Sequence, residues 1–106
     1  MSLSTHVLDA AHGRPAPGVS VRLTTMGGDH LVTAVTDDDG RIRELAAELA
    51  AGNYRITFDT AAYFAATGQQ GFYPEVAVTF TVTDAGQHHH VPLLLSPFAY
   101  STYRGS

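Results

Sequence analysis

The sequence predicts an all-β protein, a sandwich of short strands that carries one small helix. Apolar and polar residues alternate along several short segments, which is typical of strands with one buried face. Turns rich in Gly, Pro and Asp separate these segments at short intervals, as they do in β-sandwiches. The 106 residues suffice for one hydrophobic core, so we expect a single domain over residues 1–106.

Four strands are expected in the first half of the chain. The clearest is VSVRLTT, in which Val and Leu alternate with polar residues. Together the expected strands cover residues 3–9, 19–25, 31–36 and 41–43, and the turns between them cover residues 12–18 (HGRPAPG), 26–29 (MGGD) and 37–40 (DDDG). The three acids of DDDG indicate a structural turn, because a calcium loop needs more ligands at fixed spacing.

The second half combines further strands with one short helix. Residues 44–51 (ELAAELAA) favour a helix by propensity but are few before Gly52 and Asn53, so we expect a helical turn at most. Asp59 can cap a helix over residues 60–67, and Gly68 can end it. Strands are expected at residues 54–58, 75–83, 88–95 and 98–103.

Composition excludes several classes of function. The formal net charge is −4 and no basic stripe is present, so a nucleic-acid partner is not expected. The absence of Cys excludes disulfides and thiolate chemistry. No apolar run approaches the roughly 20 residues that a membrane helix needs, and no export signal is recognisable at the N-terminus. We therefore expect a soluble, cytoplasmic protein without a membrane partner.

Strand alternation gathers polar side chains on one face of a sheet. Residues two apart on a strand share a face, so Val91, Leu93 and Leu95 can face the core while alternate residues face outward. The side chains expected together on the outer face are those of His6, His88, His90, Ser101 and Tyr103. His89 is expected to face the core. Because histidine titrates near neutral pH, this face could serve acid–base chemistry.

Three interpretations of the histidines remain open at this point. They could form a plain surface cluster, or His88 and His90 could bind zinc with His6 as the third ligand. They could also catalyse a reaction without a metal. No acid or Cys is spaced to complete a zinc site, so we favour metal-free catalysis and expect neither metal nor cofactor.

Four stretches, in order along the whole chain, carry a family resemblance. They are LSTHVLD with GRPAPGV (residues 3–9 and 13–19), DDGR (38–41), YRITFDT with FYPEV (54–60 and 72–76), and HHHVPLLLSPFAYSTYRGS (88–106). With these motifs the chain resembles the 5-hydroxyisourate hydrolases, the transthyretin-related enzymes of purine breakdown. The closing YRGS is the most specific motif, because the hormone-carrying transthyretins lack it.

The resemblance implies a fold, an assembly and a reaction. The fold would be a transthyretin-like sandwich of two four-stranded sheets with one short helix. Four copies would form a homotetramer whose active sites lie at the dimer–dimer interface. The reaction would be hydrolysis of 5-hydroxyisourate to 2-oxo-4-hydroxy-4-carboxy-5-ureidoimidazoline, by a water that a histidine activates and a carbonyl that an arginine polarises.

The resemblance also assigns the site, residue by residue. The implied catalytic residues are His6, Arg41 and His90, and the implied substrate-binding residues are His6, Arg41, Ser101, Tyr103 and Ser106. Which histidine is the general base stays open. The family usually has His-Tyr-His at residues 88–90, whereas this chain has His89 in the middle, where we expect altered packing rather than lost activity.

Two other functions are compatible with a sandwich of this kind. A transthyretin-like carrier would hold a small hydrophobic ligand in the same channel between subunits. A purely structural adhesion module would leave the polar outer face unexplained. The ionisable residues and the YRGS ending favour the hydrolase over both.

Overall fold

The computed structural model describes residues 2–105, and this range contains nine strands and one helix. The elements are β1 (Leu3–Asp9), β2 (Arg14–Pro15), β3 (Ser20–Thr25), β4 (His30–Val35), β5 (Arg41–Ala46), β6 (Gly52–Phe58), α1 (Thr60–Ala66), β7 (Val76–Val82), β8 (His89–Ser96) and β9 (Ala99–Thr102). No helix within residues 2–105 is long and apolar enough to cross a membrane.

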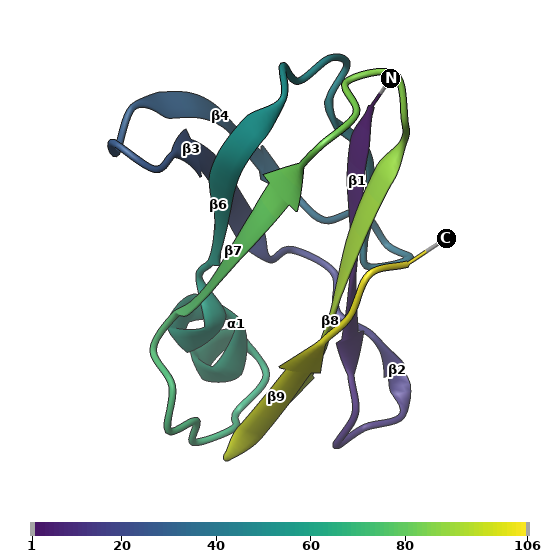
Figure 1. Cartoon of the computed structure of the whole chain (residues 1–106). Coiled ribbons are helices and arrows are strands. Elements are labelled where there is room, and N and C mark those ends of the chain that lie inside the picture. The colour runs from purple at the N-terminus through teal and green to yellow at the C-terminus, as the bar shows by residue number, and fades with distance from the viewer. Residues whose placement is uncertain (1, 106) are drawn as a thin grey trace.

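Two sheets pack face to face, as Figure 1 shows. One sheet has the order β2-β1-β8-β9, with β5 also paired to β1, and the other has the order β4-β3-β6-β7. Strands β1 and β8 are parallel, and the other pairs are antiparallel. The sandwich predicted from the sequence is therefore confirmed. Its first sheet gains the two-residue β2, which lies in a segment that was expected to be only a turn.

The core lies between the inner faces of the two sheets. Its members are the apolar residues that alternate along the strands, and fully buried examples include Val7, Val21, Ile56 and Leu93. Because these side chains come from both sheets, the core fixes which face of each strand is turned outward. Alternate residues of β1 and β8 must then project away from the core.

The expected short helix is confirmed as α1. The Asp59 carboxylate caps it by accepting a hydrogen bond from the Ala62 backbone N–H at 3.2 Å. Tyr63 and Phe64 lie on its buried side and pack into the core cluster. The helix joins β6 to β7 and does not cover the outer face of the β1–β8 pair.

The helical turn expected within residues 44–51 is wrong. Strand β5 continues to Ala46, and residues 47–51 are not helical. Leu3 pairs with Ala46 and Thr5 with Ile42, with a register irregularity between them that lets Leu45 enter the core. Pairing with β1 and burial of Leu45 outweigh the local helix propensity of a segment too short to hold a helix alone.

The DDDG segment forms the expected turn and leads directly into β5. Asp37 Oδ1 accepts hydrogen bonds from the backbone N–H groups of Asp39 at 2.8 Å and Arg41 at 3.0 Å. Gly40 has a φ of 72°, and a Cβ at this position would overlap the Val7 carbonyl oxygen. Only glycine fits such a conformation at such close approach. The turn therefore holds the start of β5 tightly against β1.

A buried carboxylate joins the end of β1 to α1. Asp9 Oδ2 accepts hydrogen bonds from the Tyr63 hydroxyl at 2.6 Å, from Gln69 Nε2 at 3.2 Å and from His12 Nδ1 at 2.9 Å. Burial alone would raise the pKa of Asp9, but these hydrogen bonds and one from the His12 backbone prevail and lower it to about 2. Burial, together with the hydrogen bond to Asp9 and the charge of that carboxylate, raises the pKa of Tyr63 to about 12.

We predict that Asp9→Asn lowers the free energy of unfolding at neutral pH by about 2 kcal/mol, the worth of a pKa fall of nearly two units. Because the folded-state pKa lies below its usual 3.8, the ionised carboxylate stabilises the fold fully above that value. This contribution is lost as the pH falls from about 4 to about 2.

Urea unfolding of the parent chain and the variant at several pH values, at one fixed protein concentration, measures the difference. The difference should shrink on acidification, and a constant gap from neutral pH to about pH 2 would contradict the argument. Asp38→Asn, which removes an exposed carboxylate, is the matched control and should change stability little.

Candidate active site

The parallel pairing of β1 and β8 brings together residues from the two ends of the chain. Ser4 pairs with His90, and His6 pairs with Pro92. Thr5 and Val91 are buried, whereas His6 and His90 keep partial exposure on the opposite face. The outer-face assignment made from strand alternation therefore agrees with the structure for both histidines.

Strand β5 adds an arginine to the same face. Arg41 pairs directly with His6 across the β1–β5 ladder, and Ile42 turns into the core. Arg41, His88 and His90 line one surface cavity of about 220 Å³, together with Ser4, Thr5 and Arg43. Three of the residues singled out on the sequence, His6, Arg41 and His90, thus come from three neighbouring strands.

Ser4 links two of the histidines. Its hydroxyl lies 2.7 Å from His90 Nδ1 and 2.9 Å from His88 Nε2. The Ser2 hydroxyl lies 2.5 Å from His88 Nδ1. Sequence reasoning gave Ser4 no role, although it shares the outward parity of His6 and so carried a readable signal.

A backbone carbonyl fixes the orientation of His6. His6 Nε2 lies 2.9 Å from the carbonyl oxygen of Asp39, in the turn that precedes Arg41. A carbonyl oxygen only accepts, so Nε2 must carry the proton of this hydrogen bond. The nitrogen of neutral His6 that remains able to accept a proton is therefore Nδ1.

The surroundings of His90 favour its neutral form. Burial lowers the pKa of His90, and the nearby Arg41, His6 and His88 lower it further, while a hydrogen bond with the Ser4 backbone acts in the opposite direction. A neutral imidazole can accept a proton from water, whereas imidazolium cannot. His90 therefore stays available as a base below the pH at which an ordinary histidine becomes protonated.

Gly105 packs directly against the His90 ring. It forms an isolated bridge with His90, and its backbone N–H donates to the His90 carbonyl oxygen at 2.9 Å. A Cβ at position 105 would overlap the imidazole. The glycine of the YRGS motif thus lets the C-terminal segment lie close enough to confine this ring.

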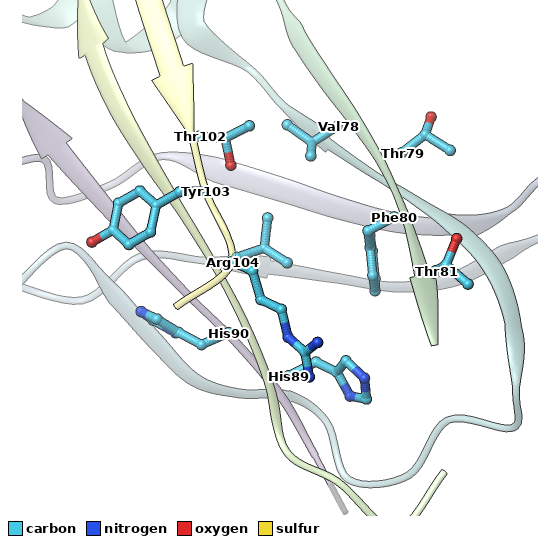
Figure 2. A pocket seen from close by; sticks show the side chains of 10 residues that line it. Val78, Thr79, Phe80, Thr81, His89, His90, Thr102, Tyr103 and Arg104 are labelled. Atoms are coloured by element: carbon cyan, nitrogen blue, oxygen red, sulfur yellow. The ribbon is translucent and has the colours of Figure 1, made fainter. Parts of the chain in front are cut away.

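Figure 2 shows the side chains around a second cavity of about 330 Å³ at the β7 edge. Tyr103 and His90 lie on one side of the C-terminal strands, and the side chain of Arg104 extends toward His89 on the other. His89 is buried at 7% exposure, as expected, and its Nδ1 lies 3.1 Å from the Gln87 carbonyl oxygen. The histidine in place of tyrosine therefore faces away from Arg41 and His90.

Of the other predicted substrate-binding residues, Ser101 lies away from His90. Ser101 pairs with Leu94, so it lies on the outer face about 13 Å along the sheet from His90. Ser106 lies outside the described residues. The roles expected for Ser101, Tyr103 and Ser106 stay predictions.

The site contains the groups that hydrolysis of a carbonyl compound needs. Within residues 2–105, no three His, Asp or Glu side chains are close enough together to hold a metal ion. A neutral imidazole can take a proton from water, and the Arg41 guanidinium can hold a developing negative charge. No cysteine is present to form a covalent thioester, and a histidine base with an arginine suffices for direct attack by water.

Comparison with known proteins shows similarity to one family over nearly the whole chain. Residues 3–105 match the model of the HIUase/Transthyretin family. A 5-hydroxyisourate hydrolase of Salmonella dublin is 49% identical over 109 residues, covering 98% of this chain and 80% of that protein. The structure of Klebsiella pneumoniae 5-hydroxyisourate hydrolase superposes with a TM-score of 0.92 at 41% identity, covering 100% of both chains. Sea bream transthyretin in complex with thyroxine gives a TM-score of 0.91 at 37% identity, covering 99% of this chain and 95% of that one.

We predict that His90 titrates below the ordinary histidine value of 6.5, because burial, the Arg41 charge and the neighbouring His6 and His88 oppose its protonation. Arg41→Gln should move this pKa upward, since it removes the nearest fixed positive charge. Imidazole chemical shifts followed by NMR across pH measure both values. Arg22→Gln, on the other sheet, is the matched control; an unshifted His90 in the Arg41 variant would contradict the electrostatic account.

Proposed function

Because the chain belongs to the HIUase/Transthyretin family over residues 3–105, we propose that it hydrolyses 5-hydroxyisourate to 2-oxo-4-hydroxy-4-carboxy-5-ureidoimidazoline. The observation that carries the proposal is a cavity in which Arg41 lies beside His90, a histidine held neutral by its surroundings. The reaction opens a cyclic amide: water attacks the ring carbonyl, the C–N bond breaks, and a carboxyl group is left on the product.

His90 is the general base in this proposal. Ser4 occupies its Nδ1 side, so Nε2 is the nitrogen that would take a proton from the attacking water. Its lowered pKa keeps Nε2 free of a proton near neutral pH, which is the state a base needs. General base assistance of this kind typically contributes about 10²–10⁴-fold in rate.

Arg41 would bind the planar ring and stabilise the oxyanion that forms as water adds to the carbonyl. Its guanidinium presents donors in a fixed fork, which matches paired oxygen acceptors better than an ammonium does. A single oxyanion donor is worth about 3–4 kcal/mol in comparable sites. The short turn that ends at Gly40 supports this role, because it restricts the backbone at the start of β5, where Arg41 lies.

His6 would complete the site from the neighbouring strand. Its Nε2–H is committed to the Asp39 carbonyl, so Nδ1 is the nitrogen that would face the substrate. It would take the remaining hydroxyl proton of the tetrahedral intermediate and pass that proton to the leaving nitrogen. Tyr103, Ser101 and Ser106 remain proposed substrate-binding residues.

A carrier of small hydrophobic ligands is the second candidate, because sea bream transthyretin shares the fold closely. A carrier channel must present an apolar lining to such a ligand. Here the cavity is lined by two arginines, two histidines and hydroxyl groups, which favour a polar, planar substrate instead. The hydrolase is therefore the better supported function.

We also propose that the active protein is a homotetramer with its sites at the dimer–dimer interface. Strands β4, β7 and β9 end their sheets, and unpaired edges of this kind invite pairing with another copy. Exposed apolar side chains, among them Phe72, Phe98 and Tyr100, supply surface for such contacts. The cytoplasmic location expected from the sequence stays a prediction.

Freshly generated 5-hydroxyisourate should decay faster in the presence of the protein than in buffer, as followed by ultraviolet absorbance. His90→Ala and His6→Ala should each lower kcat by about 10²-fold or more, since each removes a group that handles protons. Arg41→Lys should also be poor, because the ammonium lacks the fork.

The same assay with chelator present tests metal dependence, and the proposal expects no change. Catalysis that His90→Ala leaves intact would reject the assignment of the base. A protein that binds thyroxine and leaves the decay of 5-hydroxyisourate unchanged would favour the carrier over the hydrolase.

Native mass spectrometry should show a mass of four chains of 11.3 kDa each. The reason is that unpaired edge strands and exposed aromatic side chains favour contact with another copy of the chain over contact with water. A monomer that is fully active at assay concentration would contradict the proposed interface.

A further inference from the structure

Four hydrogen-bonding groups form a continuous row from His90 to the N-terminal residues. Ser4 Oγ lies 2.7 Å from His90 Nδ1 and 2.9 Å from His88 Nε2, and Ser2 Oγ lies 2.5 Å from His88 Nδ1. Every member is a hydroxyl or an imidazole, which can donate and accept at once. The three contacts fall within hydrogen-bond distance, so the row has no gap.

The donor and acceptor inventory gives the row a single direction. A base that receives a proton at His90 Nε2 carries its other proton on Nδ1, which then donates to Ser4 Oγ. The Ser4 hydroxyl has one hydrogen, which is then free to point at His88 Nε2. His88 in turn carries its proton on Nδ1 and donates to Ser2 Oγ. When His90 carries a proton on Nδ1 and can act as a base at Nε2, each hydrogen bond of the row therefore runs from His90 toward Ser2.

The row also leads from a shielded position to solvent. His90 is partly buried and Ser4 is buried at 8% exposure, whereas His88 is exposed. Burial of His90 lowers its pKa. A proton taken up at His90 thus has a hydrogen-bonded route to the surface through Ser4.

The proposed reaction produces a proton that must leave the site. Opening a cyclic amide with water gives a carboxylic acid and an N–H group, and the acid ionises at neutral pH because its pKa is near 4. Each turnover therefore releases one net proton. Until His90 loses the proton that it received, it cannot activate the next water.

We propose that Ser4 and His88 form a proton relay that carries this proton from His90 to solvent; the inference rests on the hydrolase function proposed above. The attacking water gives one proton to His90 Nε2 as its oxygen bonds to the carbonyl carbon. As the ring C–N bond breaks, the other proton of that water passes by way of His6 Nδ1 to the leaving nitrogen, and the product is left as a carboxylate. His90 Nδ1–H passes its proton to Ser4 Oγ, the Ser4 hydrogen passes to His88 Nε2, and His88 Nδ1–H passes its own to Ser2 or water. In this proposal Ser4 and His88 act through His90 and are positioning and transfer residues.

Two variants separate proton transfer from simple positioning. Ser4→Ala breaks the row and leaves both histidines in place. His88→Gln puts an amide near the Nε2 position, which keeps a partner for the Ser4 hydroxyl but cannot pass a proton on. Ser20→Ala makes the same change as the first variant on β3 of the other sheet and is the matched control.

The measurement is kcat and KM at about pH 8, where a shift in the His90 pKa no longer alters its protonation. Each is determined in dilute buffer and again with increasing imidazole, a small proton acceptor that can replace a relay. Ser4→Ala and His88→Gln should lower kcat by about 10-fold in dilute buffer, within the range of lost acid–base assistance, while KM changes little. Added imidazole should restore much of kcat in both variants and leave the parent chain and Ser20→Ala unchanged.

The outcomes distinguish failure of the relay from failure of the hydrolase function on which it rests. A loss of kcat in Ser4→Ala that imidazole does not restore would show a purely structural role for Ser4 and overturn the relay. A His88→Gln variant with the parent kcat in dilute buffer would also overturn it, with the hydrolase function left standing. A parent chain that does not accelerate 5-hydroxyisourate decay would instead remove the proposed function, and the relay with it.

Discussion

The structure depends most on the parallel pairing of β1 with β8. This ladder joins residues 86 positions apart in the chain, such as Ser4 and His90. The β1–β8 pair lies in the middle of its sheet. Strand β9 pairs with β8, whereas β2 and β5 both pair with β1. Burial of Val7 and Leu93 beneath the ladder sets its register, because a slip of one residue would turn these side chains outward. The same register places the histidines beside one another.

Around this ladder, neighbouring groups control one another's protonation. Arg41 and two further histidines surround His90 and, together with burial, disfavour its charged form. The Asp39 carbonyl fixes the tautomer of His6, and one serine hydroxyl couples His88 to His90. Gly105 leaves just enough room for the His90 ring. Ser4, the Asp39 carbonyl and Gly105 are not catalytic in the proposal, yet each sets the proton position or orientation of a histidine in the site.

The comparison proteins show why fold alone does not decide function. An enzyme and a hormone-binding protein give TM-scores of 0.92 and 0.91 against this chain. The sandwich therefore serves as a scaffold, and the outward residues of the β1–β8–β5 surface decide what it does. In this chain those residues are polar and titratable, which suits hydrolysis better than retention of an apolar ligand.

The sequence by itself predicted most of the strands, the capped helix and the side of each strand on which a residue lies, but not β2 or the full length of β5. Alternation alone assigned His6 and His90 to one outer face and His89 to the core, because the pleat repeats every two residues. The motif resemblance added the family and Arg41. Alternation does not say which strands are neighbours or in what register, since backbone hydrogen bonds between strands are the same for every sequence. The tertiary structure therefore decided that Ser4 bridges His88 and His90, and that Leu45 joins a strand rather than a helical turn.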